Sequence, residues 1–275
     1  MTGIELEHYL DNFYGYGSWD SKAWFIGKEE GGGNEMSVCF RKVVNFNNFD
    51  INKNDLLDLR DYHLTLSNND SKWFLPPFPL QGTWKLYLFL LMNNVDFINT
   101  KSKKDYQAYK FARNKENNCI TDRKCALIEL LPLPNPYDDN EWPNRWPLWE
   151  QEVLDHDRTL LSLNKDEYRE NYIPPRIRHI CTQIKKYKPK NIICPIGGAN
   201  SIYRTYLEDL VRCIDKSNIK PGWVDILHFD GKRSMYFDIN NGGTRIIITY
   251  SPTLFIAGGT GSWNRFFEPV KNALI

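Results

Sequence analysis

The sequence predicts an α/β fold, a three-layer α/β/α sandwich with a central four-stranded parallel sheet. Two observations support this prediction. Four short, nearly continuous apolar runs are typical of parallel strands that are buried on both faces. Segments with helical periodicity lie between these runs, and strands that alternate with helices form a parallel sheet covered by helices. The expected strands are Ala23–Gly27, Cys125–Leu131, Asn191–Ile196 and Arg245–Thr249.

Each expected strand is closed by residues that favour a turn. Gly27 ends the first strand, and Pro132 follows the second. The dipeptide Gly197-Gly198 follows the third strand, and Pro252 follows the fourth. Glycine and proline interrupt regular structure, so they mark the strand ends. Because parallel strands end at the same edge of a sheet, the four following loops should lie together.

The segments between the strands predict helices and one hairpin. The expected helices are Leu80–Met92, Pro174–Lys188 and Ser201–Cys213. Two further apolar segments, Trp223–Phe229 and Ser234–Phe237, flank the turn dipeptide Asp230-Gly231. This arrangement predicts a hairpin or an extension at the edge of the sheet. No linker interrupts the pattern, so we expect residues 1–275 to form a single domain.

Composition limits the possible functions. A hydrophobic content of 41% is enough for a core, and a formal net charge of +1 means that any binding of nucleic acid would depend on local patches. We expect no membrane segment, because no apolar run is long enough to span a bilayer. The six cysteines form no C-x-x-C pair, so we expect reduced, mostly buried thiols in a cytoplasmic protein. They are Cys39, Cys119, Cys125, Cys181, Cys194 and Cys213.

The loop after the first expected strand carries the strongest functional signal. Glu29 and Glu30 follow that strand and are followed by three glycines, residues 31–33. Glycine allows the backbone to approach a ligand closely. Two carboxylates in such a loop are typical of a metal site, of a catalytic acid with a helper, or of solvated turn residues. The local pattern alone leaves these three interpretations open.

The order of residues at the strand ends resembles the uracil-DNA glycosylase superfamily. The first motif of this family has five positions. They are Gly, a variable residue, one of Asp, Asn or Ala, then Pro, and finally an aromatic residue or Gly. Gly27-Lys28-Glu29-Glu30-Gly31 occupies the corresponding place here. The family's last motif is His or Asn, Pro and Ser, matched here by Ser251-Pro252-Thr253. The resemblance covers Ala23 to Phe267 and also includes Pro79-Leu80-Gln81-Gly82. It implies cleavage of an N-glycosidic bond in DNA without a metal or organic cofactor.

Three departures from the family pattern indicate an unusual target base. Glu30 replaces the usual Pro, and Ser251 stands where the family usually has His. Glu129 falls near the position of the Asn that reads uracil in this family. A carboxylate at that position accepts a hydrogen bond from the exocyclic amine of cytosine, whereas uracil presents a carbonyl. The departures therefore favour a base other than uracil.

The resemblance implies roles for the residues at the strand ends. Positive charge develops on the sugar during cleavage, so a carboxylate can stabilise it and orient water, with Glu29 preferred over Glu30. Glu129 would read the base or protonate it on departure; alternatively it pairs with Arg123 or Lys124, or points away from the pocket. The other candidates are Ser251 for catalysis, Gly27, Lys28, Gly31, Phe40, Phe78 and Thr253 for substrate binding, and Gly198, Trp263 and Arg265 for DNA binding.

Three further segments bear on DNA binding. Two of them are rich in lysine, Lys101–Lys115 and Lys185–Lys190. Each either contacts the DNA backbone or forms a solvated helix surface. Asp138–Trp149 is rich in tryptophan and forms either a wall around a large base or a lid over the core.

The sequence hypothesis is a monomeric DNA glycosylase that flips a modified pyrimidine out of the duplex. Some relatives of this fold remove glucosylated hydroxymethylcytosine from phage DNA as a bacterial defence, and the altered base-reading position is compatible with that target. Two alternatives remain. One is conventional repair of uracil or another deaminated base, and the other is a non-catalytic nucleic-acid-binding protein on the same fold.

Overall fold

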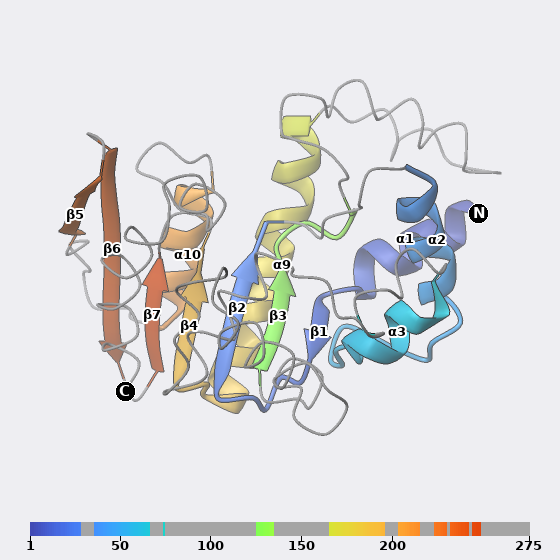
Figure 1. Cartoon of the computed structure of the whole chain (residues 1–275), viewed down its shortest axis with the longest axis horizontal. Helices are drawn as coiled ribbons and strands as arrows, with labels where there is room; N and C mark the ends of the chain where they lie inside the picture. The colour runs from blue at the N-terminus through green and yellow to red at the C-terminus, as the bar shows by residue number, and fades with distance from the viewer. Residues whose placement is uncertain are drawn as a thin grey trace, which may run out of the picture.

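Seven strands form one mixed sheet in the order β1-β3-β2-β4-β7-β6-β5 (Figure 1). The computed structural model describes residues 1–28, 36–66, 74, 125–134, 165–195, 203–214, 223–229, 232–241 and 244–248. The strands are β1 Gly15–Gly17, β2 Ala23–Gly27, β3 Cys125–Glu129, β4 Asn191–Cys194, β5 Trp223–Phe229, β6 Lys232–Asn241 and β7 Thr244–Ile248. Helices pack against this sheet, so the predicted α/β class is confirmed.

The centre of the sheet is parallel. β2 pairs in parallel with both β3 and β4, and β4 pairs in parallel with β7. These are the four strands expected from the apolar runs. β2 has the predicted bounds, whereas β3 ends at Glu129 rather than at Leu131. The chain beyond β3 still follows β2, since the N–H groups of Leu130 and Leu131 donate to the carbonyls of Gly27 and Lys28 at 3.1 and 2.7 Å.

The four predicted strands form the parallel centre of the sheet, and three antiparallel strands extend it to seven. β5 and β6 form the expected hairpin, and β6 pairs with β7. β1 pairs with β3 on the other side and was not predicted. Its sequence, Gly-Tyr-Gly, has low strand propensity. A Cβ at Gly15 or Gly17 would lie 1.9 or 2.1 Å from a carbonyl oxygen of β3, so only glycine permits this close pairing.

Five helices are described. They are α1 Gly3–Asn12, α2 Met36–Phe46, α3 Leu59–Thr65, α9 Lys165–Tyr187 and α10 Arg204–Ile214. α1, α2 and α3 gather near β1, while α9 and α10 lie together behind the sheet in Figure 1. Within the described residues, no helix is long and apolar enough to cross a membrane. The expected helix Leu80–Met92 lies outside the described residues.

α9 begins earlier than predicted. The sequence predicts a start at Pro174, since proline normally interrupts a helix, yet both Pro174 and Pro175 lie inside α9. The turns before the prolines are held by burial of Tyr168 and Ile173, each at most 1% exposed. The Tyr168 hydroxyl also accepts a hydrogen bond from the Leu133 N–H at 3.0 Å. This contact ties the start of α9 to the segment that follows β3.

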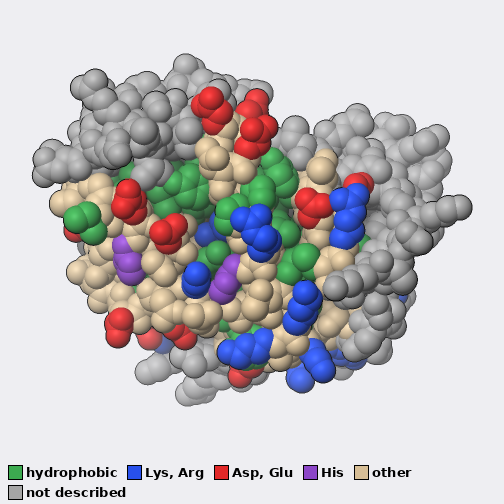
Figure 2. All heavy atoms as spheres, turned by 180° about the vertical axis from the view of Figure 1, so that it is seen from behind, with side chains coloured by type: hydrophobic (Ala, Val, Ile, Leu, Met, Phe, Trp, Pro, Cys, Tyr) green, Lys and Arg blue, Asp and Glu red, His purple; other side chains and the backbone are tan. Residues whose placement is uncertain are grey.

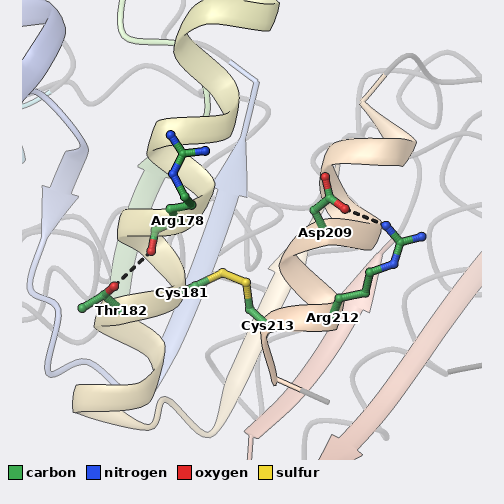
Figure 3. The surroundings of a disulfide bond; sticks show 6 residues. All are labelled: Arg178, Cys181, Thr182, Asp209, Arg212 and Cys213. Atoms are coloured by element: carbon green, nitrogen blue, oxygen red, sulfur yellow. Dashed lines mark hydrogen bonds and ion pairs between the residues drawn. A yellow bond between two sulfur atoms is a disulfide. The ribbon is translucent and has the colours of Figure 1, made fainter. Parts of the chain in front are cut away.

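A disulfide joins α9 to α10 through Cys181 and Cys213, whose Cα atoms are 5.8 Å apart (Figure 3). The expectation of reduced thiols is therefore wrong for these two cysteines. Cys39, Cys125 and Cys194 are buried and stand outside any disulfide in the part of the chain that the structure describes. Burial raises the pKa of the Cys194 thiol, which disfavours the reactive thiolate. The pairing depends on the packing of two helices, so the spacing of cysteines in the sequence does not reveal it.

Candidate functional site

The carboxyl edge of the sheet, defined here by the strand ends Gly27, Glu129 and Cys194, is the candidate site. In chain order the parallel strands are β2, β3, β4 and β7, but in space β2 lies between β3 and β4. The chain thus leaves β2 for one neighbour and later returns to the other. Such a reversal creates a topological switch point, and open α/β sheets bind ligands outside the strand ends at that point. The switch point here lies between β2 and β4.

Gly27 and Glu129 meet at this edge. They are opposite each other in the register of β2 and β3. A Cβ at Gly27 would lie only 2.5 Å from Oε2 of Glu129, so the carboxylate occupies the space beside the glycine. The Glu129 side chain therefore lies over Gly27, at the end of β2. Two residues predicted for substrate binding are brought together, and the absence of a side chain at position 27 makes this possible.

A buried arginine fixes the end of β3. Arg176 on α9 is 2% exposed, and its Nε and Nη2 donate to the carbonyl of Glu129 at 3.2 and 2.7 Å. Its guanidinium lies 4.0 Å from the centroid of the Tyr14 ring. Burial lowers the pKa of Arg176, and the charges of neighbouring groups that include Tyr14 and Glu129 act in the opposite direction. The guanidinium stays charged, since arginine is not deprotonated in proteins.

Sequence reasoning missed Arg176, although a signal was present. Ile173, Ile177 and Ile180 form the apolar stripe of α9, and all three are buried. Arg176 falls within this stripe at helical spacing. A charged side chain on the buried face of a helix needs a partner inside the protein, so its position could have marked it.

Two more cations gather around Tyr203, the residue before α10. Nζ of Lys28, directly after β2, lies 5.4 Å from the centroid of the Tyr203 ring. Cζ of Arg169, near the start of α9, lies 5.6 Å from the same centroid. Tyr203 immediately precedes α10 and is 1% exposed, so the ring is held by the core. Lys28 was a predicted site residue, whereas Arg169 and Tyr203 were not, because no local motif marks them.

No protein-family model matches the chain, and no curated protein matches it significantly.

The remaining predicted residues divide into two groups. Phe40 lies on α2 and packs, half-buried, against the core. The others lie outside the described residues, so their roles stay predictions. They are Glu29, Glu30, Gly31, Phe78, Gly198, Ser251, Thr253, Trp263 and Arg265, together with the segments Lys101–Lys115 and Asp138–Trp149.

The lysine-rich segment Lys185–Lys190 lies at the opposite, amino edge of the sheet. It spans the end of α9 and leads into β4, whose first N–H, from Asn191, donates to the Lys22 carbonyl at 3.0 Å. Four residue steps of about 3.3 Å along β2 separate the two edges by about 13 Å. Figure 2, which views the molecule from behind, shows exposed Lys and Arg side chains in its lower part. Cations at a helix C-terminus complement its dipole, which favours the solvated-surface interpretation.

A pocket of about 410 Å³ also lies at the amino edge. Its lining residues are Gly17, Ser18, Trp19, Asp20, Asp50, Ile51, Asn54, Asp55, Leu56 and Tyr187. Apart from Tyr187, which belongs to the segment Lys185–Lys190, none of them was predicted to take part in function. Three aspartates are among them, but the part of the chain that the structure describes contains no cluster of His, Cys, Asp or Glu arranged to hold a metal ion.

Gly27→Ala is expected to displace the Glu129 carboxylate. The added methyl would lie 2.5 Å from Oε2, which is the end of a flexible side chain and can move aside. We therefore expect the free energy of unfolding to fall by only about 1 kcal/mol, as measured by urea denaturation. In a Glu129→Ala background, Gly27→Ala should lower the free energy of unfolding by much less, because the clashing carboxylate is absent. An equal loss of free energy in both backgrounds would show that Gly27 and the Glu129 carboxylate are not in contact.

Proposed function

We propose that this chain is a DNA glycosylase that hydrolyses the N-glycosidic bond of a modified cytosine in DNA. The observation that carries the proposal is the carboxylate of Glu129, held over Gly27 beside the switch point of the sheet. The order of motifs at the strand ends, which resembles the uracil-DNA glycosylase superfamily, supports it. The proposal includes the finer fold assignment, a three-layer sandwich of the uracil-DNA glycosylase type.

Glu129 supplies the base recognition in this proposal. An ionised carboxylate only accepts hydrogen bonds, and the exocyclic amine of cytosine donates them. Arg176 is a buried cation that interacts electrostatically with Glu129. Of the two roles considered for Glu129, this proposal assigns it that of acceptor from the base.

Glu29 supplies the chemistry on the sugar side. It follows Lys28 directly in the chain. As the bond from C1′ to the base breaks, its electron pair leaves with the base, and the sugar becomes cationic. The Glu29 carboxylate stabilises this charge and orients a water, whose oxygen bonds to C1′. The water's proton goes to Glu29 and then to solvent, and the departing base takes a proton from solvent.

The bulkiest target under this proposal is glucosylated hydroxymethylcytosine in phage DNA. The sequence feature that favours it is the aromatic segment Asp138–Trp149, which supplies apolar surface for a sugar. Removal of such a base would give the protein a role in defence against phage.

A panel of duplexes tests the proposed reaction. Each duplex carries one cytosine, hydroxymethylcytosine, glucosylated hydroxymethylcytosine or uracil at the same position, and alkali cleaves the strand where a base has been lost. We expect cleavage at the modified cytosines and none at unmodified cytosine. A preference for uracil would indicate conventional repair. Binding to the duplexes without any cleavage would indicate a non-catalytic binder.

Glu129→Asn is expected to shift the preference from the cytosine-type base toward uracil. An amide both donates and accepts, so it can pair with the carbonyl that uracil presents. The measurement is a competition between the two bases in otherwise identical duplexes. Asp20→Asn, which removes a carboxylate at the amino edge, serves as the control and should leave the preference unchanged. If Glu129→Asn lowers both activities by the same factor, Glu129 has a structural role only.

A further inference from the structure

The cations beside Tyr203 form a second functional feature of the carboxyl edge. The charged groups of Lys28 and Arg169 both lie within 6 Å of the Tyr203 ring centroid, at 5.4 and 5.6 Å. Cations at this distance from a tyrosine ring are attracted by its electron-rich face. Because Tyr203 is 1% exposed, its ring is a fixed platform. The platform orients the Lys28 ammonium directly beyond the end of β2.

Among the described residues, the carboxylates in the first turns of α9 lie toward solvent. Asp166 accepts a hydrogen bond from Nη1 of Arg169 at 3.0 Å, but its side chain is 83% exposed, against 9% for Arg169. Burial raises the pKa of Tyr206, one turn along α10 from Tyr203, and the charges of Glu170 and Asp166 add to this effect. Exposed carboxylates are screened by water and salt, so Asp166 offsets the charge of Arg169 only partly.

The ends of the helices add to the positive potential. α10 begins at Arg204, next to Tyr203, and α9 begins at Lys165, close in sequence to Arg169. The N-terminus of a helix carries a partial positive charge. Two helix N-termini and two cations therefore meet beside the switch point between β2 and β4.

We propose that Lys28, oriented by the Tyr203 ring, binds a phosphate of the DNA backbone, and that Arg169 strengthens this contact through its positive charge. This inference rests on the proposed function. It gives the carboxyl edge two functions, since Glu129 at the end of β3 reads the base and Lys28 directly after β2 holds the backbone. Contacts to phosphate fix the register of a protein on DNA, whereas contacts to base edges give specificity.

The test compares two lysines at opposite ends of the same strand. Lys28→Gln removes the cation after β2, and Lys22→Gln removes the exposed cation just before it. Affinity for an unmodified duplex is measured over a range of salt concentrations. Each phosphate contact contributes about 0.9 to the slope of log affinity against log salt. We expect Lys28→Gln to reduce the slope by about that amount, and Lys22→Gln to leave it unchanged. Lys28→Arg should retain the slope.

The outcomes separate this inference from the proposed function. Equal slopes for Lys28→Gln and the wild type, at equal thermal stability, would overturn the inference, as would absence of binding to the duplex. If the slope falls for Lys28→Gln but not for Lys22→Gln, and no duplex of the panel is cleaved, the phosphate contact is supported and the glycosylase activity is rejected. A last experiment measures the thermal unfolding temperature of the wild type and of Lys28→Gln with and without inorganic phosphate. If phosphate stabilises the wild type but not Lys28→Gln, and duplex affinity is the same for both, the ligand is a small phosphate compound rather than DNA.

Discussion

The Glu29→Gln protein is expected to bind DNA normally but to lose turnover by roughly 100-fold or more. Glutamine has nearly the same shape as glutamate, so it preserves packing and binding. It carries no negative charge, so it cannot stabilise the cationic sugar or accept a proton from the attacking water. Single-turnover rates on the best duplex of the panel, together with affinity for the same duplex, measure the two properties separately.

Glu30→Gln is the matched control for this experiment. It removes the same charge one position along the chain, and we expect most activity to remain. If the effects are reversed, Glu30 is the catalytic carboxylate, which is the second choice in the sequence hypothesis. If both variants retain full activity, the assignment of a catalytic acid to this loop is wrong.

Loss of the disulfide between Cys181 and Cys213 is expected to lower the free energy of unfolding by about 3–4 kcal/mol. The bond closes a loop between residues that are 32 positions apart, which restricts the unfolded chain. It also joins α9, which carries Arg169 and Arg176, to α10, which begins next to Tyr203 (Figure 3). Urea denaturation of the Cys181→Ala, Cys213→Ala double variant measures the effect.

The reduced wild type is the control for the double variant. Treatment with reductant should bring the wild type close to the stability of the variant, and reductant should leave the variant unchanged. Cys39→Ala, which removes a buried thiol outside the disulfide, should respond to reductant as the wild type does. A wild type whose unfolding midpoint is insensitive to reductant would contradict the prediction.

Much of the central fold could be predicted from the sequence. The bounds of β2 and the existence of the other three parallel strands followed from apolar runs closed by glycine or proline. These signals are local, because burial on both faces imposes an apolar run on each strand separately. The hairpin of β5 and β6 followed from a turn dipeptide for the same reason. The place of Lys185–Lys190 could also have been predicted, since it leads directly into a strand and must lie at the amino edge.

The candidate site could be predicted only in part. The sequence indicated Gly27, Lys28 and Glu129 as residues at strand ends, and the structure brings the first and third into contact. Arg176, Arg169 and Tyr203 were missed. Two prolines suggested that α9 begins at Pro174, so the start of the helix, with Arg169, lay outside the expected element. Packing of Tyr168 and Ile173 against the core outweighs the local effect of proline.

The α/β class, the parallel strands and the residue types at their ends follow from local sequence patterns. The order of the strands, and with it the switch point between β2 and β4, follows only from tertiary packing. Tertiary packing also decides that Glu129 lies over Gly27, that Lys28 lies over Tyr203, and that Cys181 meets Cys213. The physical reason is that each pair is far apart in the chain. Such contacts depend on register and on helix packing, which are properties of the whole core rather than of any local segment.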